Sequence, residues 1–395
     1  MHTNYQPSRT YRAAVVGCGG MGRNHVHALA NLPGIDLVAL VDVFQPNLDR
    51  AGNEVELDPD RRYQDFAQMC DEQRPDFVVI ATQAPQHAEL TIAAAQRGIH
   101  VICEKPLALN LTEADAMVQA CQTAGVRLAV NHLRRMTPAS TLARDLIAAG
   151  EIGEILAVDI HDKGGRPIGN TLMEMATHYF DEARFLLSRR ILADGRCADE
   201  LEWVYARLST GLGAAAHAAT SAEIMHSQVA KPTDRDCGLV LGERGTVVLG
   251  FAGEVQAVAR FHNLPKADAS YDGIDVIGTD GALAVRGGFS KYLYRRHGHT
   301  FADHDRWEPV AIPGSEAYFA VDNRDAGRLL CQWMAQEMMA AIEEGREHVA
   351  SGRDGLVSLE SLMAVYVSHR QGVPVTLPLV DRRHPLAVWQ AEMTG

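Results

Sequence analysis

The sequence lacks any apolar run near the roughly 20 residues that a membrane-spanning helix requires. Residues 1–12 are polar and contain neither a hydrophobic signal core nor a twin-arginine pair, so we expect no export. A basic excess is also missing, because the formal net charge is -13, and a negative surface opposes binding to nucleic-acid phosphates. These absences predict a cytoplasmic protein with neither a membrane nor a nucleic-acid partner.

Cysteine patterns typical of zinc sites and disulfide frameworks are absent as well. The seven cysteines form no CxxC pair and their number is odd, which favours reduced thiols and no structural zinc. Residues 295–305 contain several histidines and aspartates, the residue types that bind metals. Because this stretch has no HExxH-type helical spacing, we interpret it as a polar surface loop and expect no metal.

The composition is that of an ordinary globular protein with room for two domains. The chain has 395 residues, of which 47% are hydrophobic and 22% charged. In the first third, short apolar runs alternate with helix-compatible segments, as in βαβ units that build a parallel sheet. The strands expected there are residues 13–16, 37–41, 77–80, 99–103 and 126–130. We therefore predict a Rossmann domain over residues 1–132.

The pattern changes after about residue 132. Helices are expected at residues 137–149, 171–187, 325–344 and 356–370. Strand-like segments separated by turns that contain glycine occupy much of residues 197–310, with an earlier strand at 155–160. This arrangement predicts a second domain, residues 133–395, of the α+β class with a mostly antiparallel sheet. The whole chain is therefore expected to be an α/β protein.

A glycine-rich turn between the first expected strand and the following helix fits the pattern GxGxxG. Its residues are Gly17, Gly19, Gly20, Met21 and Gly22. Such a turn bends tightly, lets the backbone approach a pyrophosphate and lets the helix pack on the strand. Asp42 ends the second strand, 42 − 22 = 20 positions after the last glycine. A carboxylate there accepts hydrogen bonds from the adenosine ribose and repels the extra phosphate of NADP. The motif predicts a dinucleotide site that prefers NAD to NADP.

The fourth expected strand leads into Glu104-Lys105-Pro106. Ligands of open α/β sheets bind beyond the carboxyl ends of the strands, so we expect this tripeptide to border the cleft. A lysine there suits proton transfer if partial burial and the nicotinamide cation lower its pKa, and Glu104 could orient it. The alternative is a solvated Lys-Glu pair at the end of a strand.

These motifs and several others resemble those of the glucose–fructose oxidoreductase, inositol dehydrogenase and rhizopine catabolism (Gfo/Idh/MocA) family. The matching segments are residues 16–22 with His25, 81–82 with His87, 98–108, 130–138, 150–155, 351–356 with Ser368, and 373–378. The resemblance implies a Rossmann domain followed by an α/β domain with a large open sheet. One face of that sheet would line the substrate cleft and the other would pack on another subunit, which implies a homodimer or homotetramer.

The resemblance also implies catalytic residues. Lys105 matches the lysine of the family's Glu-Lys-Pro motif, which is usually assigned to hydroxyl binding and proton transfer. His178 matches a helical histidine, and Glu174 stands four residues before it, where the family usually has aspartate. This spacing places both side chains on one face of an α-helix. The alternative is an ordinary Glu-His pair on a helix surface.

Further cofactor contacts are expected from residues at the ends of the strands. These residues are Thr82, His87, Glu104, Lys105, Asn131 and Arg135. His87 could equally cap its helix, and Arg135 could equally contact substrate or form a salt bridge to the Rossmann domain.

The leading functional hypothesis is an NAD-dependent dehydrogenase that acts on CH–OH groups of a sugar, inositol or sugar acid. A hydride would move to the nicotinamide while Lys105 or His178 accepts the hydroxyl proton. A second hypothesis is an enzyme that holds NAD tightly and uses transient oxidation for elimination or glycoside cleavage, which the glutamate at position 174 could mark. A third is a catalytically silent dinucleotide or sugar sensor, although the presence of Lys105 and His178 argues against it.

Overall fold

The computed structural model describes residues 5–163, 172–209, 244–262, 270–298 and 306–394. Contacts within it define two compact units, residues 1–136 with 320–357 and residues 137–319 with 358–395. The first unit therefore takes a segment from near the carboxyl end of the chain in addition to the predicted Rossmann region. None of the helices in the described residues is long and apolar enough to cross a membrane.

The first unit contains a six-stranded parallel sheet in the order β3-β2-β1-β4-β5-β6. Its strands are β1 (Tyr11–Val16), β2 (Ile35–Val41), β3 (Arg62–Tyr63), β4 (Phe77–Ile80), β5 (His100–Cys103) and β6 (Leu128–Val130). The five expected strands and the parallel Rossmann sheet are confirmed. The edge strand β3 was not predicted, because two residues are too few to show a periodic pattern.

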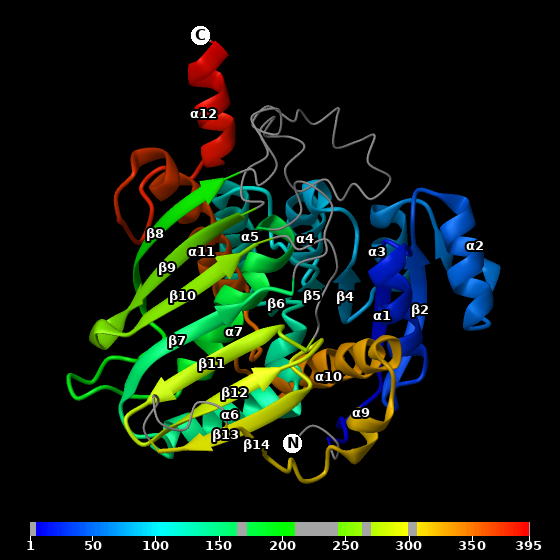
Figure 1. Cartoon of the computed structure of the whole chain (residues 1–395). Helices are drawn as coiled ribbons and strands as arrows, with labels where there is room; N and C mark the ends of the chain where they lie inside the picture. The colour runs from blue at the N-terminus through cyan, green and yellow to red at the C-terminus, as the bar shows by residue number, and fades with distance from the viewer. Residues whose placement is uncertain (1–4, 164–171, 210–243, 263–269, 299–305, 395) are drawn as a thin grey trace. The chain divides into compact units, whose positions relative to one another are not determined.

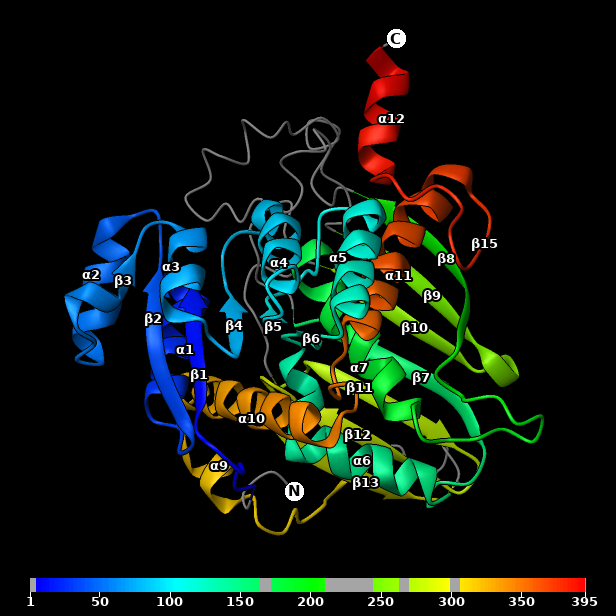
Figure 2. The ribbon, with the colours of Figure 1, turned by 180° about the vertical axis from the view of Figure 1, so that it is seen from behind.

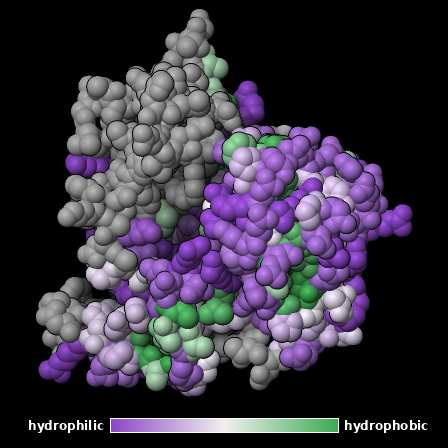
Figure 3. Space-filling model, turned by 90° about the vertical axis from the view of Figure 1, so that its right-hand side faces the viewer, coloured by the Kyte–Doolittle hydropathy of each residue, from purple (hydrophilic) through white to green (hydrophobic). Residues whose placement is uncertain are grey.

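Helices connect and cover these strands (Figure 1). They are α1 (Gly20–Ala30), α2 (Gln45–Glu54), α3 (Phe66–Gln73), α4 (His87–Ala95) and α5 (Leu111–Ala124), together with the late helix α10 (Asn323–Glu344). Helix α10 packs against α1, and this contact brings the late segment into the first unit. The surface that carries α2, which faces the viewer in Figure 3, is mostly hydrophilic with smaller apolar groups between.

The second unit contains a nine-stranded sheet in the order β14-β13-β12-β11-β7-β10-β9-β8-β15. Its strands are β7 (Ile155–His161), β8 (Leu201–Ser209), β9 (Arg244–Phe251), β10 (Gln256–Phe261), β11 (Gly273–Gly278), β12 (Gly281–Arg286), β13 (Tyr292–His297), β14 (Glu308–Pro309) and β15 (Val375–Thr376). Strands β7 and β10 pair in parallel, and the other described pairs are antiparallel. The predicted mostly antiparallel sheet is confirmed.

One face of this sheet is covered by helices. Helix α6 (Pro138–Ala148) contacts β12 and β13, and α7 (Thr177–Leu187) contacts β7 and β11. Helix α11 (Gly352–Gln371) reaches β8, where Ser368 Oγ accepts a hydrogen bond from Ala206 N at 2.9 Å. Figure 1 shows these helices behind the sheet, and Figure 2, which views it from the opposite side, shows them in front of it. The short helix α9 (Glu316–Ala320) follows β14 in the chain, and α12 (Pro385–Thr394) is the last helix of the described residues.

The other face of the sheet is open among the described residues. Along β10, Ala257, Ala259 and Phe261 are buried, whereas the alternating residues Gln256 and Arg260 are exposed. Successive side chains of a strand point to opposite faces, so the buried set faces the helices and the exposed set faces away from them.

The expected helix at residues 171–187 has two parts. Residues Leu172–Ala176 form a π-helical turn, and the regular α-helix α7 begins at Thr177. The expectation of one continuous α-helix is therefore wrong for the segment that contains Glu174. A π-helical turn bonds i to i+5 and is often found at functional sites, a feature that helical periodicity does not reveal.

Candidate active site

The glycine-rich turn joins β1 to α1 and is held close to β2. Gly17 adopts φ +89°, a left-handed conformation that suits glycine, and its N–H donates to Val41 O at 2.7 Å. A Cβ atom at Gly22 would lie 1.8 Å from Gly17 O, so only glycine permits this approach of helix to strand. These contacts explain the first and third glycines of the motif.

The middle of the turn is open and fits a pyrophosphate. A Cβ at Gly19 or Gly20 would meet no atom within 4 Å. Gly19 is the N-cap of α1 and supplies no side-chain oxygen to the amides of the first turn. Backbone amides at a helix N-terminus bind phosphate anions, so Gly19, Gly20, Met21 and Gly22 can hold the NAD pyrophosphate. NAD would supply the hydride-accepting nicotinamide when it is bound.

Asp42 follows β2, and its carboxylate organises the turn. Oδ2 accepts hydrogen bonds from Cys18 N at 2.8 Å and Asn47 Nδ2 at 3.1 Å, and Oδ1 accepts one from Phe44 N at 2.9 Å. Two carboxylate oxygens offer about four acceptor positions, so one remains for a ribose hydroxyl. Asp42 therefore links the glycine turn to the segment where the adenosine ribose is expected.

Glu104 lies at the carboxyl end of β5 and is buried. Its Oε1 accepts hydrogen bonds from Asn131 Nδ2 at 2.6 Å and His25 Nε2 at 3.2 Å, and its Oε2 accepts one from Lys105 N at 3.1 Å. Burial opposes ionisation, but the hydrogen bonds and charges of His25, Lys105 and Asn131 outweigh it and lower the pKa of Glu104 to about 2. Glu104 is therefore an anchored carboxylate directly before Lys105, and the solvated-pair alternative does not describe it.

His25 lies on α1, and its side chain is only 1% exposed. Burial opposes its protonation, but the neighbouring Cys331 and the carboxylate of Glu104 raise its pKa to about 10. Cys331 Sγ, on α10, is 3.9 Å from the same ring nitrogen that contacts Glu104. Lys105 itself is half-buried, and its backbone N–H is held by Glu104.

His87 supports the same tripeptide from α4. Its Nδ1 lies 2.9 Å from Pro106 O and its Nε2 lies 3.3 Å from Thr82 O. Burial lowers the pKa of His87, so the ring is neutral and carries one N–H, which the shorter contact assigns to Nδ1. The Nδ1–H donor therefore ties α4 to the segment that carries Pro106. The role of His87 as a direct cofactor contact stays a prediction, as does that of Thr82, which is half-buried.

Arg135 and Asn131 have well-defined partners within the first unit. Arg135 Nη2 lies 3.1 Å from Asp354 Oδ1, and its Nη1 donates to Val349 O at 2.8 Å. Asn131 donates to Glu104 as described above. Both side chains thus have partners within the protein close after β6, and their cofactor contacts stay predictions.

The predicted residues of the second unit surround the start of α7. His178 lies in the first turn of α7 and is half-buried, and Glu174 lies in the π-helical turn, its side chain outside the described part. The next residue, Tyr179, is fully buried and donates its hydroxyl to Asp272 Oδ1 at 2.7 Å. Asp162 Oδ1, directly after β7, is 3.4 Å from the same hydroxyl. These contacts fix the start of α7 against the ends of two strands.

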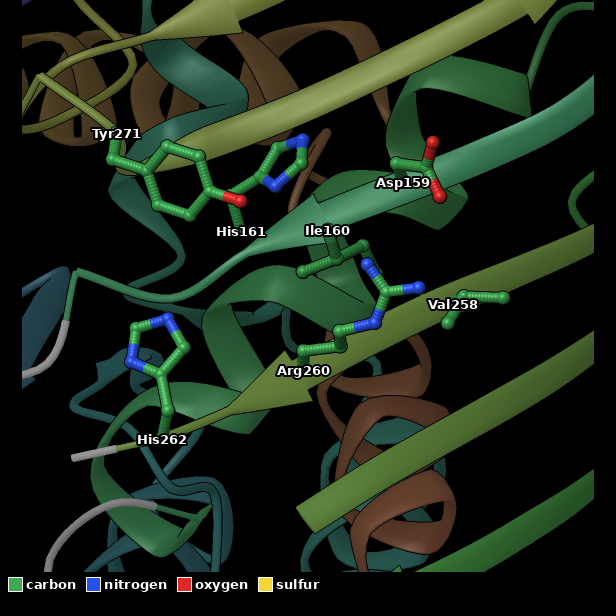
Figure 4. Close-up of a pocket in the computed structure, with 7 residues that line it drawn as sticks. All are labelled: Asp159, Ile160, His161, Val258, Arg260, His262 and Tyr271. Carbon is green, nitrogen blue, oxygen red and sulfur yellow. The ribbon is translucent and has the colours of Figure 1, made fainter. Parts of the chain in front are cut away.

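A pocket opens on the face of the second sheet that points away from α6 and α7 (Figure 4). It is lined by Asp159, Ile160 and His161 of β7, Val258 and Arg260 of β10, and His262 and Tyr271. The His161 and Tyr271 rings are 4.7 Å apart between centroids, and His161 Nε2 lies 3.1 Å from Asp275 Oδ2. Arg286 also pairs with Asp275. His161 therefore belongs to a polar network on this face.

Two residues that contribute to the site were not predicted from the sequence as site residues. The family resemblance includes His25 but implies no role for it, and no motif in the sequence marks Asn47. The fixed offset of His25, three residues after Gly22, was the available signal. No group of metal-binding side chains is found in the described residues, and positions 299–305 of the histidine-rich stretch lie outside them.

The glycine turn, the acid after β2 and the anchored Glu-Lys-Pro segment together define an NAD-binding oxidoreductase with a Rossmann fold. Residues 11–132 match the sequence model of the Gfo/Idh/MocA oxidoreductase family, described as having an NAD-binding Rossmann fold. Over residues 11–132 the chain therefore belongs to this family, and it is related to inositol and apiose dehydrogenases.

Individual relatives are distant. A D-apiose dehydrogenase from Paraburkholderia graminis is 29% identical over 402 residues, which cover 95% of this chain and 92% of the relative. A myo-inositol 2-dehydrogenase from Thermotoga maritima is 29% identical over 195 residues, covering 47% of this chain and 58% of that enzyme. The crystal structure of an oxidoreductase from Agrobacterium radiobacter in complex with NAD+, L-tartaric acid and magnesium has a TM-score of 0.72 at 21% identity, covering 93% and 98% of the two chains. This structural likeness concerns the fold.

Proposed function

We propose that the protein is an NAD-dependent dehydrogenase that oxidises a hydroxyl-bearing carbon of a sugar, inositol or sugar acid. The observation that carries this proposal is the anchoring of Glu104-Lys105-Pro106 at the carboxyl end of β5. Glu104 is held by three donors and Pro106 by His87, so the lysine between them starts from a rigid backbone. When a hydride is removed from an alcohol, the protein must hold a group in place to accept the hydroxyl proton. The similarity of the chain to an apiose dehydrogenase and an inositol dehydrogenase supports this substrate class.

Each proposed residue has a separate task. Lys105 binds the substrate hydroxyl and accepts its proton, with Glu104 as its anchor. His178 shares or relays that proton, since an imidazole titrates near neutral pH, and Glu174 orients His178. The amides of the glycine turn hold the pyrophosphate, and Asp42 binds the adenosine ribose and disfavours NADP. Thr82, His87, Asn131 and Arg135 border the nicotinamide side.

The test is a panel of sugars, polyols and sugar acids with NAD, followed by NADH absorbance. With the substrate so identified, Lys105→Met should lower kcat by about 10² to 10⁴-fold while the NAD dissociation constant changes little. His178→Ala should act similarly and Glu174→Gln more mildly. Arg97→Met serves as a control, because it removes a cation of the first unit that pairs with Asp71 on the surface.

Three results would contradict the proposal in different ways. Full turnover by Lys105→Met would remove the lysine from the reaction. Retained NAD with product formation but no net reduction of added NAD would favour an elimination or glycoside cleavage. Binding of NAD and sugar without turnover of any panel member would favour a sensor.

We also propose that the protein forms a homo-oligomer, a dimer or a tetramer, through the open face of the second sheet. Support comes from β10, whose face away from the helices carries Val258 beside the exposed Arg260 and Gln256. Half-buried Tyr205 and Val248 lie in register with Val258 on neighbouring strands. A nine-stranded sheet with one face left uncovered by the described residues gains stability when a second copy covers that face.

Light scattering tests this assembly. We expect a species of at least twice 43.0 kDa for the unmodified protein. Val258→Glu should shift it toward the monomer, because a charge placed in a self-complementary interface faces its own copy. A monomer at working concentration, or an unchanged assembly of Val258→Glu, would argue against this face as the interface.

A further inference from the structure

The carboxylate of Glu104 has two basic side chains near it, His25 and Lys105. His25 reaches it from α1 with Nε2 at 3.2 Å from Oε1, and Lys105 follows it in the chain. A buried carboxylate needs a compensating charge or it becomes protonated. Glu104 is the acceptor in all three of its hydrogen bonds, and accepting hydrogen bonds stabilises the ionised form of a carboxyl group.

We propose that His25 is a positioning residue for Lys105: as a buried imidazolium it is the counter-ion of Glu104, so that Lys105 gives up its proton more readily. This inference rests on the proposed role of Lys105 as a base. If Lys105 alone balanced Glu104, the carboxylate would hold the ammonium form and oppose proton transfer. With His25 in that role, Glu104 anchors the backbone of Lys105 without fixing its charge.

The surroundings of His25 favour the charged ring. Its contacts come from Glu104 after β5 and from Cys331 on α10, and Asn131 and Lys105 complete the donors around Glu104. Among the described residues, His25 and Lys105 are the basic side chains that act on Glu104. Burial of the imidazole on α1 thus has an electrostatic purpose beyond packing.

The first experiment observes His25 directly and requires no substrate. Ring ¹⁵N and ¹H signals of the full-length protein are followed from pH 5 to pH 10, and His25 is assigned from their loss in His25→Gln. We expect the His25 ring to stay protonated at pH 8, where an ordinary histidine has lost about 97% of its proton. A ring that loses its proton near pH 6.5 would overturn the proposal. If the ring becomes neutral at pH 8 in Cys331→Ala, the sulfur rather than Glu104 holds the charge, and the proposal is also wrong.

The second experiment follows Lys105. The chain has five lysines, so reductive ¹³C-methylation gives a simple spectrum in which Lys105→Met identifies the signal. Loss of a neighbouring positive charge should move the deprotonation of Lys105 in His25→Gln upward by about one pH unit. Glutamine can still donate to Glu104, so the variant removes the charge and keeps the hydrogen bond. An unchanged titration of Lys105 would show that His25 has only a structural role.

His27→Gln is the matched control. His27 lies on the same helix and pairs with Glu54 at 3.0 Å, on the exposed side of α1. It should leave the Lys105 titration and the kcat/KM profile unchanged. In the active enzyme, the acidic limb of kcat/KM, which reports protonation of the base, should move upward by about one pH unit in His25→Gln. This is a roughly tenfold loss of kcat/KM at pH values below that limb, with NAD affinity retained.

These readouts separate the inference from the proposed function. Failure of the substrate panel would contradict the dehydrogenase, whereas the two NMR titrations test the charge arrangement without any turnover. Turnover that depends on Lys105, together with a neutral His25, would support the dehydrogenase and overturn the inference.

Discussion

Asp42 offers the sharpest test of cofactor recognition, because one carboxylate both organises the glycine turn and is proposed to bind the ribose. Replacing it with asparagine keeps the size of the side chain and removes the charge. A hydrogen bond to a charged group contributes about 1.5–3 kcal/mol, so loss of one ribose contact should weaken NAD binding by about 10- to 100-fold. NADP should not weaken equally, because its extra phosphate no longer meets a negative charge.

The structure also indicates what would receive that phosphate. Asn47 Nδ2 bonds to Asp42, and Arg50 Nη2 donates to Asn47 Oδ1 at 2.8 Å, so a cation lies two hydrogen bonds from the carboxylate. Asp42→Asn should therefore narrow the ratio of NADP to NAD dissociation constants by at least tenfold. The measurement is titration calorimetry with both cofactors.

Two comparisons keep the interpretation of Asp42 specific. Asp49→Asn, on α2 and bonded to Gln45, should leave both affinities unchanged. Asp42→Ala would additionally leave the amides of Cys18 and Phe44 without their acceptor, so its melting temperature should fall further than that of Asp42→Asn. Equal affinity of the unmodified protein for NAD and NADP would refute the reasoning, as would an unchanged ratio in Asp42→Asn.

The remaining predictions concern the same unit. Gly19→Ala should fold normally yet bind NAD more weakly, because its Cβ enters the open space proposed for the pyrophosphate. Gly22→Ala should instead lower the melting temperature, because its Cβ would collide with Gly17 O. Titration calorimetry with NAD and thermal denaturation distinguish the two effects. His87→Leu leaves Pro106 O without its donor and should cost about 1–3 kcal/mol in urea denaturation, with Thr91→Val as a control on the same helix. The pKa of His25 is raised to about 10, so the stability that His25 contributes to the fold is complete below pH 6.5 and declines as pH rises toward 10. The pKa of Glu104 is lowered to about 2, so the stability that Glu104 contributes declines as pH falls from 4.5 toward 2. The difference in urea midpoint between the unmodified protein and His25→Gln should therefore shrink from pH 6 to pH 10, and a constant difference would contradict the ion pair.

Local patterns in the sequence determined much of the first unit. Strands β1, β2, β4, β5 and β6 follow from short apolar runs, because strands buried on both faces need continuous apolar residues. The glycine motif, Asp42 and the Glu-Lys-Pro segment follow from their positions at the carboxyl ends of those strands. Each of these inferences depends on residues that are near one another in the chain.

Only the tertiary structure decided which side chains meet. His25 and Glu104 are 79 residues apart, and Cys331 is 306 residues from His25, so no local period predicts their contact. The packing of α10 against α1 is a long-range contact of the same kind, and it places a late segment in the first unit. The π-helical turn before α7 depends on hydrogen-bond geometry that a 3.6-residue periodicity does not contain. Charge compensation in a buried site is set by distances between distant residues, and the fold alone supplies those distances.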